Sequence, residues 1–311
     1  MKTIRLALSA LVIIMAASQA TAQGTWTQYQ PRIARIFDIV VKGDEFWCSS
    51  EYSVFKVDPF TMEYDEILYV PPNNIASIEK SPNGDIMVCE NSPMKFCLYS
   101  HDKWKYFWYS EINTDIRYPG SVFPSYYSYD RDGILWFAGH GIGLIRFDGE
   151  NFTKVPEVEF PQDDRVSSIC AGSDGRIWVG TRGGLYCYDG ESWAKLSFRK
   201  ENPENIVMCL AEDPDGSLWV GTLYDGILHY KNGLWDQYIP ESNGKTYSGT
   251  GSLVLDNTGT LWAALVPKYY DCFNPNSTLF SFDGTTWTAY HDPVSDKIEL
   301  KSLIFGPDGA L

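Results

Sequence analysis

The sequence lacks the features that metal-binding and nucleic-acid-binding proteins usually carry. Its four His are scattered singly, no C-x-x-C pair occurs, and no run of Lys and Arg interrupts a composition of 25 Lys+Arg against 40 Asp+Glu. The ligand spacing of a zinc site is therefore absent, and we predict no metal site. A formal net charge of −15 repels phosphate backbones and anionic headgroups, which excludes nucleic acid as an expected partner.

Signatures of catalysis are equally sparse. The sequence holds no G-x-S-x-G, no H-E-x-x-H and no Cys set beside a candidate base. The segment Gly139-His140-Gly141-Ile142-Gly143 resembles a nucleotide-binding loop, but the pattern after it predicts a strand, so the helix N-terminus that would hold a phosphate is missing. We therefore predict no cofactor and assign no catalytic residue; His140 is a weak candidate for a general base.

Long hydrophobic runs are also missing, except at the N-terminus. Lys2 and Arg5 precede an apolar run from Leu6 to Ala17, and Ala20-Thr21-Ala22 has the small-x-small pattern of a cleavage site. We predict a signal peptide over residues 1–22 and a mature chain over 23–311 that is periplasmic or secreted. No later stretch approaches the roughly 18 apolar residues of a membrane span, so we expect no membrane insertion of the mature chain. A retained N-terminal anchor is the alternative.

The seven Cys do not form a disulfide framework, because their number is odd and they are scattered singly. Cys89 and Cys97 flank a short predicted connection and could pair across a hairpin. We expect the other thiols to be small buried hydrophobic groups without a chemical role.

Aromatic residues, in contrast, are abundant, at 15% of the chain with 11 Trp. Comparing the sequence with itself shows why. The segments that begin at Val166 and Ile206 share an Asp-Gly pair, a Trp-Val-Gly-Thr motif, a Gly-led strand and a second Trp. The first Trp of the motif recurs about every 40–50 residues, which is the period of a β-propeller blade. It stands at Trp47, Trp136, Trp178, Trp219 and Trp262, with Met87 in the same place in the second copy.

Each copy divides into four short strands, here called a to d. In the fourth copy they are predicted at 166–171, 176–180, 185–188 and 192–196, with Asp174-Gly175 as the turn between a and b. Asp and Gly suit a tight hairpin because Asp caps the local backbone and Gly adopts positive φ without steric cost. Strand b is apolar on both faces, as expected for a blade between two neighbours. The repeated Trp should therefore fill the space between blades.

The copies predict an all-β fold, a seven-bladed β-propeller with four-stranded antiparallel blades. Six full copies begin near residues 36, 75, 126, 166, 206 and 252. A seventh begins at Leu300, and the given sequence ends at Leu311, one position before the expected Trp of that copy. Thr25-Trp26-Thr27-Gln28-Tyr29 matches the pattern of strand d, so an N-terminal strand should close the last blade. We expect that blade to be incomplete at the C-terminus, as in a truncated chain with sequence to follow.

The repeat resembles a known family. The pattern D-G-x-[IL]-W-V-G-T-x-x-G-[LI]-x-x-[YF]-[DK]-G-x-x-W, found at 174–193 and loosely at 132–152, is similar to the two-component regulator propeller repeat. The resemblance implies a periplasmic sensor module of a hybrid two-component system with a histidine kinase, of which many members sense polysaccharide fragments, or a stand-alone exported propeller. This sequence departs from the sensor pattern because it contains one ring and no kinase segment.

Ligand-binding candidates come from connections that join strands d to a and b to c, because such connections lie on one face of a propeller. Three of them are longer than the geometry requires, and long loops on a rigid scaffold often bind ligands. Their aromatic and charged residues suit a glycan or peptide; the alternative is that the loops only pack on one another. The candidates are Arg117, Tyr118, Tyr126, His140, Arg182, Tyr224, Asp225, Tyr247, Lys268, Tyr269 and Tyr270.

The sequence therefore favours an exported ligand-binding or sensory propeller that recognises a glycan or a partner protein through loops on one face. No motif assigns a reaction, so the non-catalytic interpretation is favoured. The enzymatic alternative is a propeller hydrolase or lyase that acts on a carbohydrate or a small cyclic substrate. A scaffold whose lateral surface binds other proteins is a third hypothesis.

Overall fold

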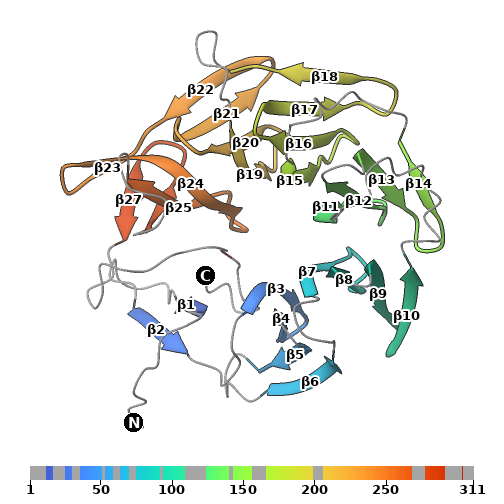
Figure 1. Cartoon of the computed structure of the whole chain (residues 1–311). Coiled ribbons are helices and arrows are strands. Elements are labelled where there is room, and N and C mark those ends of the chain that lie inside the picture. The colour runs from blue at the N-terminus through green and yellow to red at the C-terminus, as the bar shows by residue number, and fades with distance from the viewer. Residues whose placement is uncertain are drawn as a thin grey trace. The chain divides into compact units, whose positions relative to one another are not determined.

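The computed structural model contains only β-strands as regular elements in the part that it describes (Figure 1). The described residues are 12–16, 25–29, 36–50, 53–58, 64–69, 75–91, 94–108, 124–139, 143–155, 166–198, 206–267, 277–290 and 303. Five four-stranded sheets and one five-stranded sheet follow one another along the chain, and we name them blades 1 to 6. The described part divides into two compact units.

The first unit holds blades 1 and 2, in each of which every strand pairs antiparallel with the next along the chain. Blade 1 consists of β3 (Ile36–Lys42), β4 (Glu45–Ser50), β5 (Ser53–Val57) and β6 (Tyr64–Tyr69). Blade 2 consists of β7 (Ile75–Lys80), β8 (Ile86–Asn91), β9 (Met94–Ser100) and β10 (Lys103–Trp108). The first strands of the two blades, β3 and β7, lie side by side. A two-stranded sheet pairs β1 (Val12–Ala16) with β2 (Thr25–Tyr29).

The second unit holds blades 3 to 6, built on the same antiparallel plan. The first strands of blades 3 to 5 and the second strand of blade 6 lie next to one another, and the last strand of each blade forms its outer edge (Figure 1). Blade 3 is β11 (Pro124–Tyr129), β12 (Leu135–Gly139), β13 (Gly143–Phe147) and β14 (Phe152–Lys154). Blade 4 is β15 (Val166–Ala171), β16 (Ile177–Thr181), β17 (Gly184–Tyr188) and β18 (Trp193–Leu196). Blade 5 is β19 (Val207–Glu212), β20 (Leu218–Thr222), β21 (Ile227–Lys231) and β22 (Leu234–Tyr238). Blade 6 is β23 (Glu241–Ser242), β24 (Lys245–Leu255), β25 (Leu261–Pro267), β26 (Thr278–Phe282) and β27 (Trp287–Tyr290).

The repeated Trp fills the space between blades, as the pattern predicts. Trp219 on β20 is 4% exposed, and its ring meets Phe282 of blade 6 edge-on at 5.9 Å between ring centroids. Within blade 6, Phe282 in turn stacks on Trp287 at 4.7 Å. Similar series of three rings occur in other blades. A Trp on the second strand meets an aromatic ring on the third strand of the next blade, and that ring packs on a Trp of the fourth strand. The series are Trp47–Tyr99–Trp104, Trp136–Tyr188–Trp193 and Trp178–Tyr230–Trp235. Both Trp positions of the repeat therefore serve packing between and within blades.

Two other residues of the repeat have structural roles that explain their presence. The Nε1–H of Trp219 donates to Asp213, six residues earlier, at 2.9 Å, and two further blades repeat this bond. The other pairs are Trp136 with Asp130 and Trp262 with Asp256. In the Trp-Val-Gly-Thr motif, a Cβ added at Gly221 would press on Thr250 of the next blade. Only Gly allows the first strand of the neighbouring blade to approach this closely.

The strand boundaries predicted for the fourth copy agree with the structure to within one residue, and Gly175 in its turn has φ +87° as expected. The predicted placement of Tyr247 on a connection between strands d and a was wrong. Lys245–Tyr247 is not a loop, because it begins the long strand β24. Asn243 and Gly244, both with positive φ, form the tight turn between β23 and β24, which is the standard chemistry of a two-residue hairpin.

A disulfide between Cys89 and Cys97, which the sequence left open, does not fit the sheet. Cys89 lies opposite Phe96 in the β8–β9 pair, and Cys97 lies opposite Val88. Because neighbouring positions along a strand point to opposite faces, the two side chains lie on opposite sides of the blade. This geometry does not allow a bridge between them.

The predictions about the two ends of the chain remain predictions. Of the predicted signal peptide, only residues 12–16 are described, as β1. Of the predicted seventh copy, only Leu303 is described, and its N–H donates to Ser252 of β24 at 3.3 Å. The closing blade therefore lies largely outside the described residues.

Candidate functional site

One end of the blades carries the connections between second and third strands, and we call it the loop end. In blade 5 this connection runs from Thr222 to Gly226 and is tied internally. The Thr222 hydroxyl accepts from the N–H of Asp225 at 2.8 Å and donates to the carbonyl of Gly226 at 2.9 Å. Thr222 and Asp225 are buried, whereas the Tyr224 side chain between them is 54% exposed. The loop therefore holds a large aromatic ring in solvent on a fixed backbone.

The same loop is anchored to its surroundings. The side-chain amide of Gln237 on β22 donates to the carbonyl of Asp225 at 2.9 Å. From the next blade, Ser248 accepts the N–H of Gly226 at 2.7 Å and the Thr250 hydroxyl donates to the Gly226 carbonyl at 3.1 Å. Gly226 has φ +72°, a conformation that L-residues rarely adopt. These bonds leave the loop backbone little freedom and fix the point from which the Tyr224 side chain projects.

Blade 4 uses the same device to present a cation. The hydroxyl of Thr181, which is fully buried, donates to the carbonyl of Gly184 at 3.0 Å and accepts from the N–H of Gly183 at 3.1 Å. Arg182 lies between these anchors and is exposed. Arg182 and Tyr224 thus occupy equivalent connections of adjacent blades, as the sequence pattern predicts.

The other described candidates divide into one exposed and two buried residues. Tyr126 on β11 is 37% exposed, and burial of part of its side chain raises the pKa of its phenol. Asp225 and Tyr247 are each 2% exposed. The Tyr247 hydroxyl accepts from Thr278 at 3.1 Å, and its ring packs edge-on against Phe280 at 4.9 Å. In this structure Tyr247 is a core residue of blade 6.

Six predicted candidates lie outside the described residues, and the structure does not test them. They are Arg117, Tyr118, His140, Lys268, Tyr269 and Tyr270.

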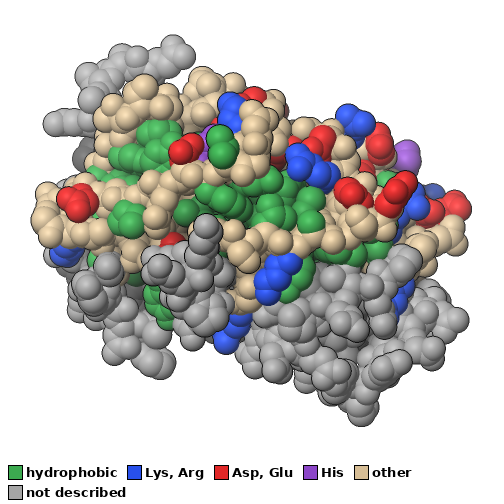
Figure 2. All heavy atoms as spheres, turned by 90° about the horizontal axis from the view of Figure 1, so that it is seen from above, with side chains coloured by type: hydrophobic (Ala, Val, Ile, Leu, Met, Phe, Trp, Pro, Cys, Tyr) green, Lys and Arg blue, Asp and Glu red, His purple; other side chains and the backbone are tan. Residues whose placement is uncertain are grey.

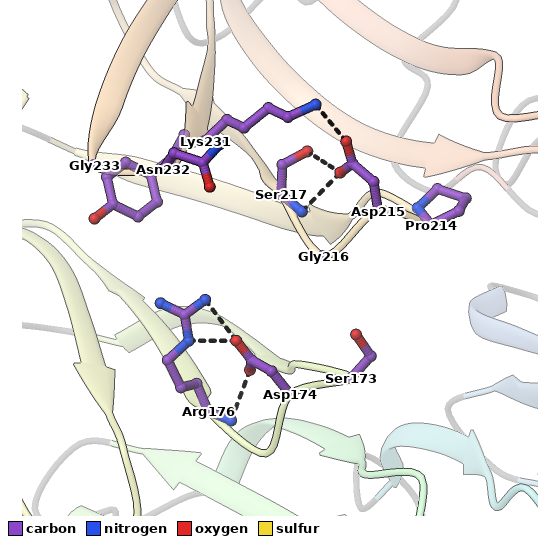
Figure 3. Close-up of a pocket in the computed structure, with 11 residues that line it drawn as sticks. Ser173, Asp174, Arg176, Pro214, Asp215, Gly216, Ser217, Lys231, Asn232 and Gly233 are labelled. Atoms are coloured by element: carbon purple, nitrogen blue, oxygen red, sulfur yellow. Dashed lines mark hydrogen bonds and ion pairs between the residues drawn. The ribbon is translucent and has the colours of Figure 1, made fainter.

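The opposite end of the blades, which carries the turns between first and second and between third and fourth strands, contains a cavity that sequence reasoning missed. We call this end the turn end. The cavity has a volume of about 520 Å³ and lies between the Asp-Gly turns of blades 4 and 5 and the turn after β21 (Figure 3). Its lining includes two ion pairs, Asp174 with Arg176 and Asp215 with Lys231. The Asp-Gly turns that line the cavity are visible in the sequence, but their residues predict tight hairpins and give no sign that two turns enclose a cavity.

A hydrogen-bonded chain leads from this cavity into the blade interface. The Ser217 hydroxyl lies 2.5 Å from Asp215 and 2.7 Å from Nε2 of His229, whose ring stacks on Trp219 at 4.0 Å. Because a carboxylate only accepts, the hydroxyl donates to Asp215 and accepts from Nε2–H. A nucleophilic serine needs the reverse, with the imidazole as acceptor. Burial lowers the pKa of His229, and the neutral ring donates to Ser217 as a structural partner.

The described residues contain no cluster of three or more His, Cys, Asp or Glu that could hold a metal ion. The thiols are also poor nucleophiles. Burial raises the pKa of Cys48, Cys170 and Cys209 to about 12 and that of Cys187 to about 11. A thiolate is required for reaction, so these four groups are inert near neutral pH.

Sequence comparison identifies the repeat. The family model of the two component regulator propeller matches residues 161–183 and 201–224, which contain the first two strands of blades 4 and 5. No curated protein matches the chain. Among the described residues no helix is both long and apolar enough to cross a bilayer.

Similar solved structures are propeller proteins. A streptogramin B lyase is 14% identical with a TM-score of 0.67, over 88% of both chains. The virginiamycin B lyase from Staphylococcus aureus is 13% identical with a TM-score of 0.62, over 84% of this chain and 85% of that one. The extracellular domain of a putative hybrid two component system from B. thetaiotaomicron is 18% identical with a TM-score of 0.52, over 86% of this chain and 36% of that one. These likenesses establish the all-β propeller fold.

Proposed function

Starting from repeats of the two-component regulator propeller type, we propose that this chain is an exported, non-catalytic propeller that binds a glycan or a partner protein at its loop end. The observation that carries the proposal is the exposed ring of Tyr224 on a connection fixed from both sides. An aromatic ring held in solvent costs little further entropy when a ligand covers it. It can stack on the apolar face of a sugar or insert into a protein surface.

Arg182 complements the ring on the neighbouring blade. Its guanidinium offers several donors for hydroxyl or carboxylate groups of a ligand. With Tyr126 also exposed in blade 3, the described loop-end candidates that reach solvent are two aromatic rings and one cation. This combination suits a glycan or a peptide better than a strongly charged ligand.

The proposal extends to location and context. A periplasmic or secreted chain follows from the predicted signal peptide, and the likeness to an extracellular domain of a putative two component system supports that location. The same likeness supports a histidine kinase, in a longer chain or a separate one, as the component that receives the signal.

An enzymatic alternative, a hydrolase or lyase that acts on a carbohydrate or a small cyclic substrate, is favoured by the likeness to two propeller lyases. Its candidate base, His140, lies outside the described residues. Turnover of a substrate by the mature chain, abolished in His140→Ala with binding retained, would establish this alternative over the non-catalytic one.

A scaffold function is favoured by the outer edge of blade 5. Leu234 at one end of β22 is 73% exposed, and Ile239 just beyond its other end is 42% exposed. Figure 2 shows apolar side chains at the surface among scattered acidic and basic ones. An edge strand with exposed apolar residues offers another protein a surface on which to dock.

Calorimetric titration of the mature chain with a panel of oligosaccharides tests the glycan form of the proposal. Tyr224→Ala should weaken binding about tenfold, because loss of an aromatic ring that covers a ligand costs on the order of 1–2 kcal/mol. Arg182→Ala should have an effect of similar size, because a hydrogen bond from a charged group is worth roughly 1.5–3 kcal/mol. Tyr106→Ala is the matched control, because Tyr106 is also an exposed tyrosine, 46% accessible, on the outer strand of blade 2. Absence of heat with every glycan, or equal losses in the control, contradicts the glycan proposal.

A further inference from the structure

The turn-end cavity has walls that are fixed before any ligand arrives. Ser173, in the Asp-Gly turn of blade 4, donates its N–H at 2.8 Å and its hydroxyl at 3.0 Å to Glu212 at the end of β19 in blade 5. From the other side, Arg131 of blade 3 donates to the carbonyl of Ser173 at 2.9 Å. The turns of three successive blades are therefore linked through one residue. A cavity of about 520 Å³ between such turns lies within the usual size of ligand sites, roughly 300–1,000 Å³.

The charge of the lining is balanced. Two carboxylates, Asp174 and Asp215, face two cations, Arg176 and Lys231, so the formal sum is zero in a protein of net charge −15. Each cation already neutralises the carboxylate of its own blade, as Figure 3 shows. A charged ligand therefore finds no uncompensated opposite charge in the lining. A neutral ligand leaves both pairs intact.

The unused hydrogen-bonding capacity of the lining favours hydroxyl groups. Asp215 accepts from the N–H and hydroxyl of Ser217 and from Lys231, and Asp174 accepts three N–H groups of Arg176. With about four acceptor sites on a carboxylate, each retains about one. Of three ammonium donors Lys231 retains two, and of five guanidinium donors Arg176 retains three with its side chain. The four charged groups thus offer about five donors and two acceptors, and the Asn232 amide, which also lines the cavity, adds two donors and an acceptor oxygen.

The lining therefore presents donors and acceptors together, which suits a hydroxyl group, because a hydroxyl both accepts and donates hydrogen bonds. A pure acceptor, such as a carboxylate or phosphate, would leave both lining carboxylates unmatched. A pure donor, such as an ammonium ion, would leave the cations unmatched. Tyr230, whose ring packs against Trp178 and Trp235, also lines the cavity and gives it an apolar wall.

We propose that the cavity between the turns of blades 4 and 5 is a binding site for a neutral, hydroxyl-rich ligand, a saccharide without charged substituents. It is a second site, at the end of the blades opposite Tyr224 and Arg182, and it does not depend on ligand binding at the loop end. One ligand there contacts both ion pairs and so bridges two blades.

Isothermal titration of the full mature chain with neutral trisaccharides, a uronic acid trisaccharide and glycylglycine tests this site. Asp215→Asn and Arg176→Gln should each weaken neutral trisaccharide binding about tenfold, the usual effect of losing a charge-assisted hydrogen bond. Asp283→Asn is the control, because Asp283 is also a turn carboxylate that accepts from backbone N–H groups and from a hydroxyl, that of Thr285, but it lies in blade 6. Thermal unfolding of every variant establishes that it is folded.

Selective weakening of neutral saccharide binding in the two cavity variants, with normal binding in Asp283→Asn and Tyr224→Ala, supports the site. Binding that fails in Tyr224→Ala and is unchanged in the cavity variants overturns it and leaves the loop-end proposal standing. Preference for the uronic acid or for glycylglycine overturns the inference from charge balance. Absence of binding by all neutral trisaccharides at millimolar concentration also overturns it.

Discussion

Replacement of Trp219 by Ala is the sharpest test of how the blades are held together. Trp219 is 4% exposed, stacks on His229 at 4.0 Å and 15° between ring planes, and meets Phe282 of blade 6 at 5.9 Å. Its Nε1–H also satisfies Asp213 at 2.9 Å. The substitution removes all of these contacts and leaves a space between two blades that rigid neighbours cannot close.

The magnitude follows from the burial and from the lost hydrogen bond. Burying roughly 150–250 Å² at about 25 cal/mol/Å² is worth on the order of 4–6 kcal/mol of transfer free energy. Large-to-small substitutions at such sites typically cost about 3–5 kcal/mol of unfolding free energy. We expect Trp219→Ala to fall in that range and to lower Tm by roughly 6–20 °C, at about 2–4 °C per kcal/mol. Trp219→Phe, which keeps a ring and loses the N–H, should cost less.

Urea and thermal unfolding followed by circular dichroism measure both quantities. Leu234→Ala is the control, because this side chain is 73% exposed and its loss should change the unfolding free energy by less than about 0.5 kcal/mol. If Trp219→Ala and Leu234→Ala both have a Tm close to that of the parent protein, the repeated Trp does not hold adjacent blades together and the packing argument is refuted.

Three further predictions concern groups on other elements. Burial, reinforced by the charge of Asp38, raises the pKa of Glu79 to about 8 from 4.5, so the parent should lose stability as pH rises between these values. In urea unfolding, Glu79→Gln should therefore have the same unfolding free energy as the parent below pH 4.5. Above pH 8 its unfolding free energy should be higher by on the order of 1–3 kcal/mol. Equal unfolding free energies at high pH would contradict the burial argument. The four inert thiols should resist alkylation in the native protein and react after unfolding, as measured by mass spectrometry. Labelling of these thiols in the native protein would contradict the prediction that burial makes them unreactive. Gly226→Ala should lower the unfolding free energy by more than about 2 kcal/mol, because Gly226 has φ +72° and the new Cβ meets the Tyr238 carbonyl. Gly233→Ala, at φ +81° with open space around it, should lower it by only about 1–2 kcal/mol. Equal losses for the two variants in urea unfolding would contradict this prediction.

The period of the sequence was sufficient to predict the blades, because their packing is local and repetitive. A Trp that must reach the next blade, a Gly that must let it approach and an Asp-Gly turn that reverses the chain recur in each copy with little freedom of spacing. For this reason the strands of blade 4 could be located to within one residue. The β23–β24 hairpin was missed because, in the described residues, it is an addition to blade 6 alone.

The candidate residues were harder to predict, because a connection's position in the repeat does not determine the exposure of its side chains. Tyr224 and Asp225 are sequence neighbours in one loop, yet one is 54% exposed and the other 2%. Tyr247 is a core residue because the hairpin before it draws its strand into the sheet. The turn-end cavity depends on which side chains from two blades face one another across a gap, and no one-dimensional pattern contains that information.

The sequence by itself therefore determined the repeat, the strand order within a blade and the interblade role of the Trp, since these depend on contacts at a fixed separation along the chain. The tertiary structure alone decided which polar residues reach solvent and which of them converge. Ser173 meets Glu212 and Arg131 only because turns about 40 residues apart lie side by side once the blades pack. Packing of the blade interfaces is what turns a periodic pattern into a local arrangement of charges.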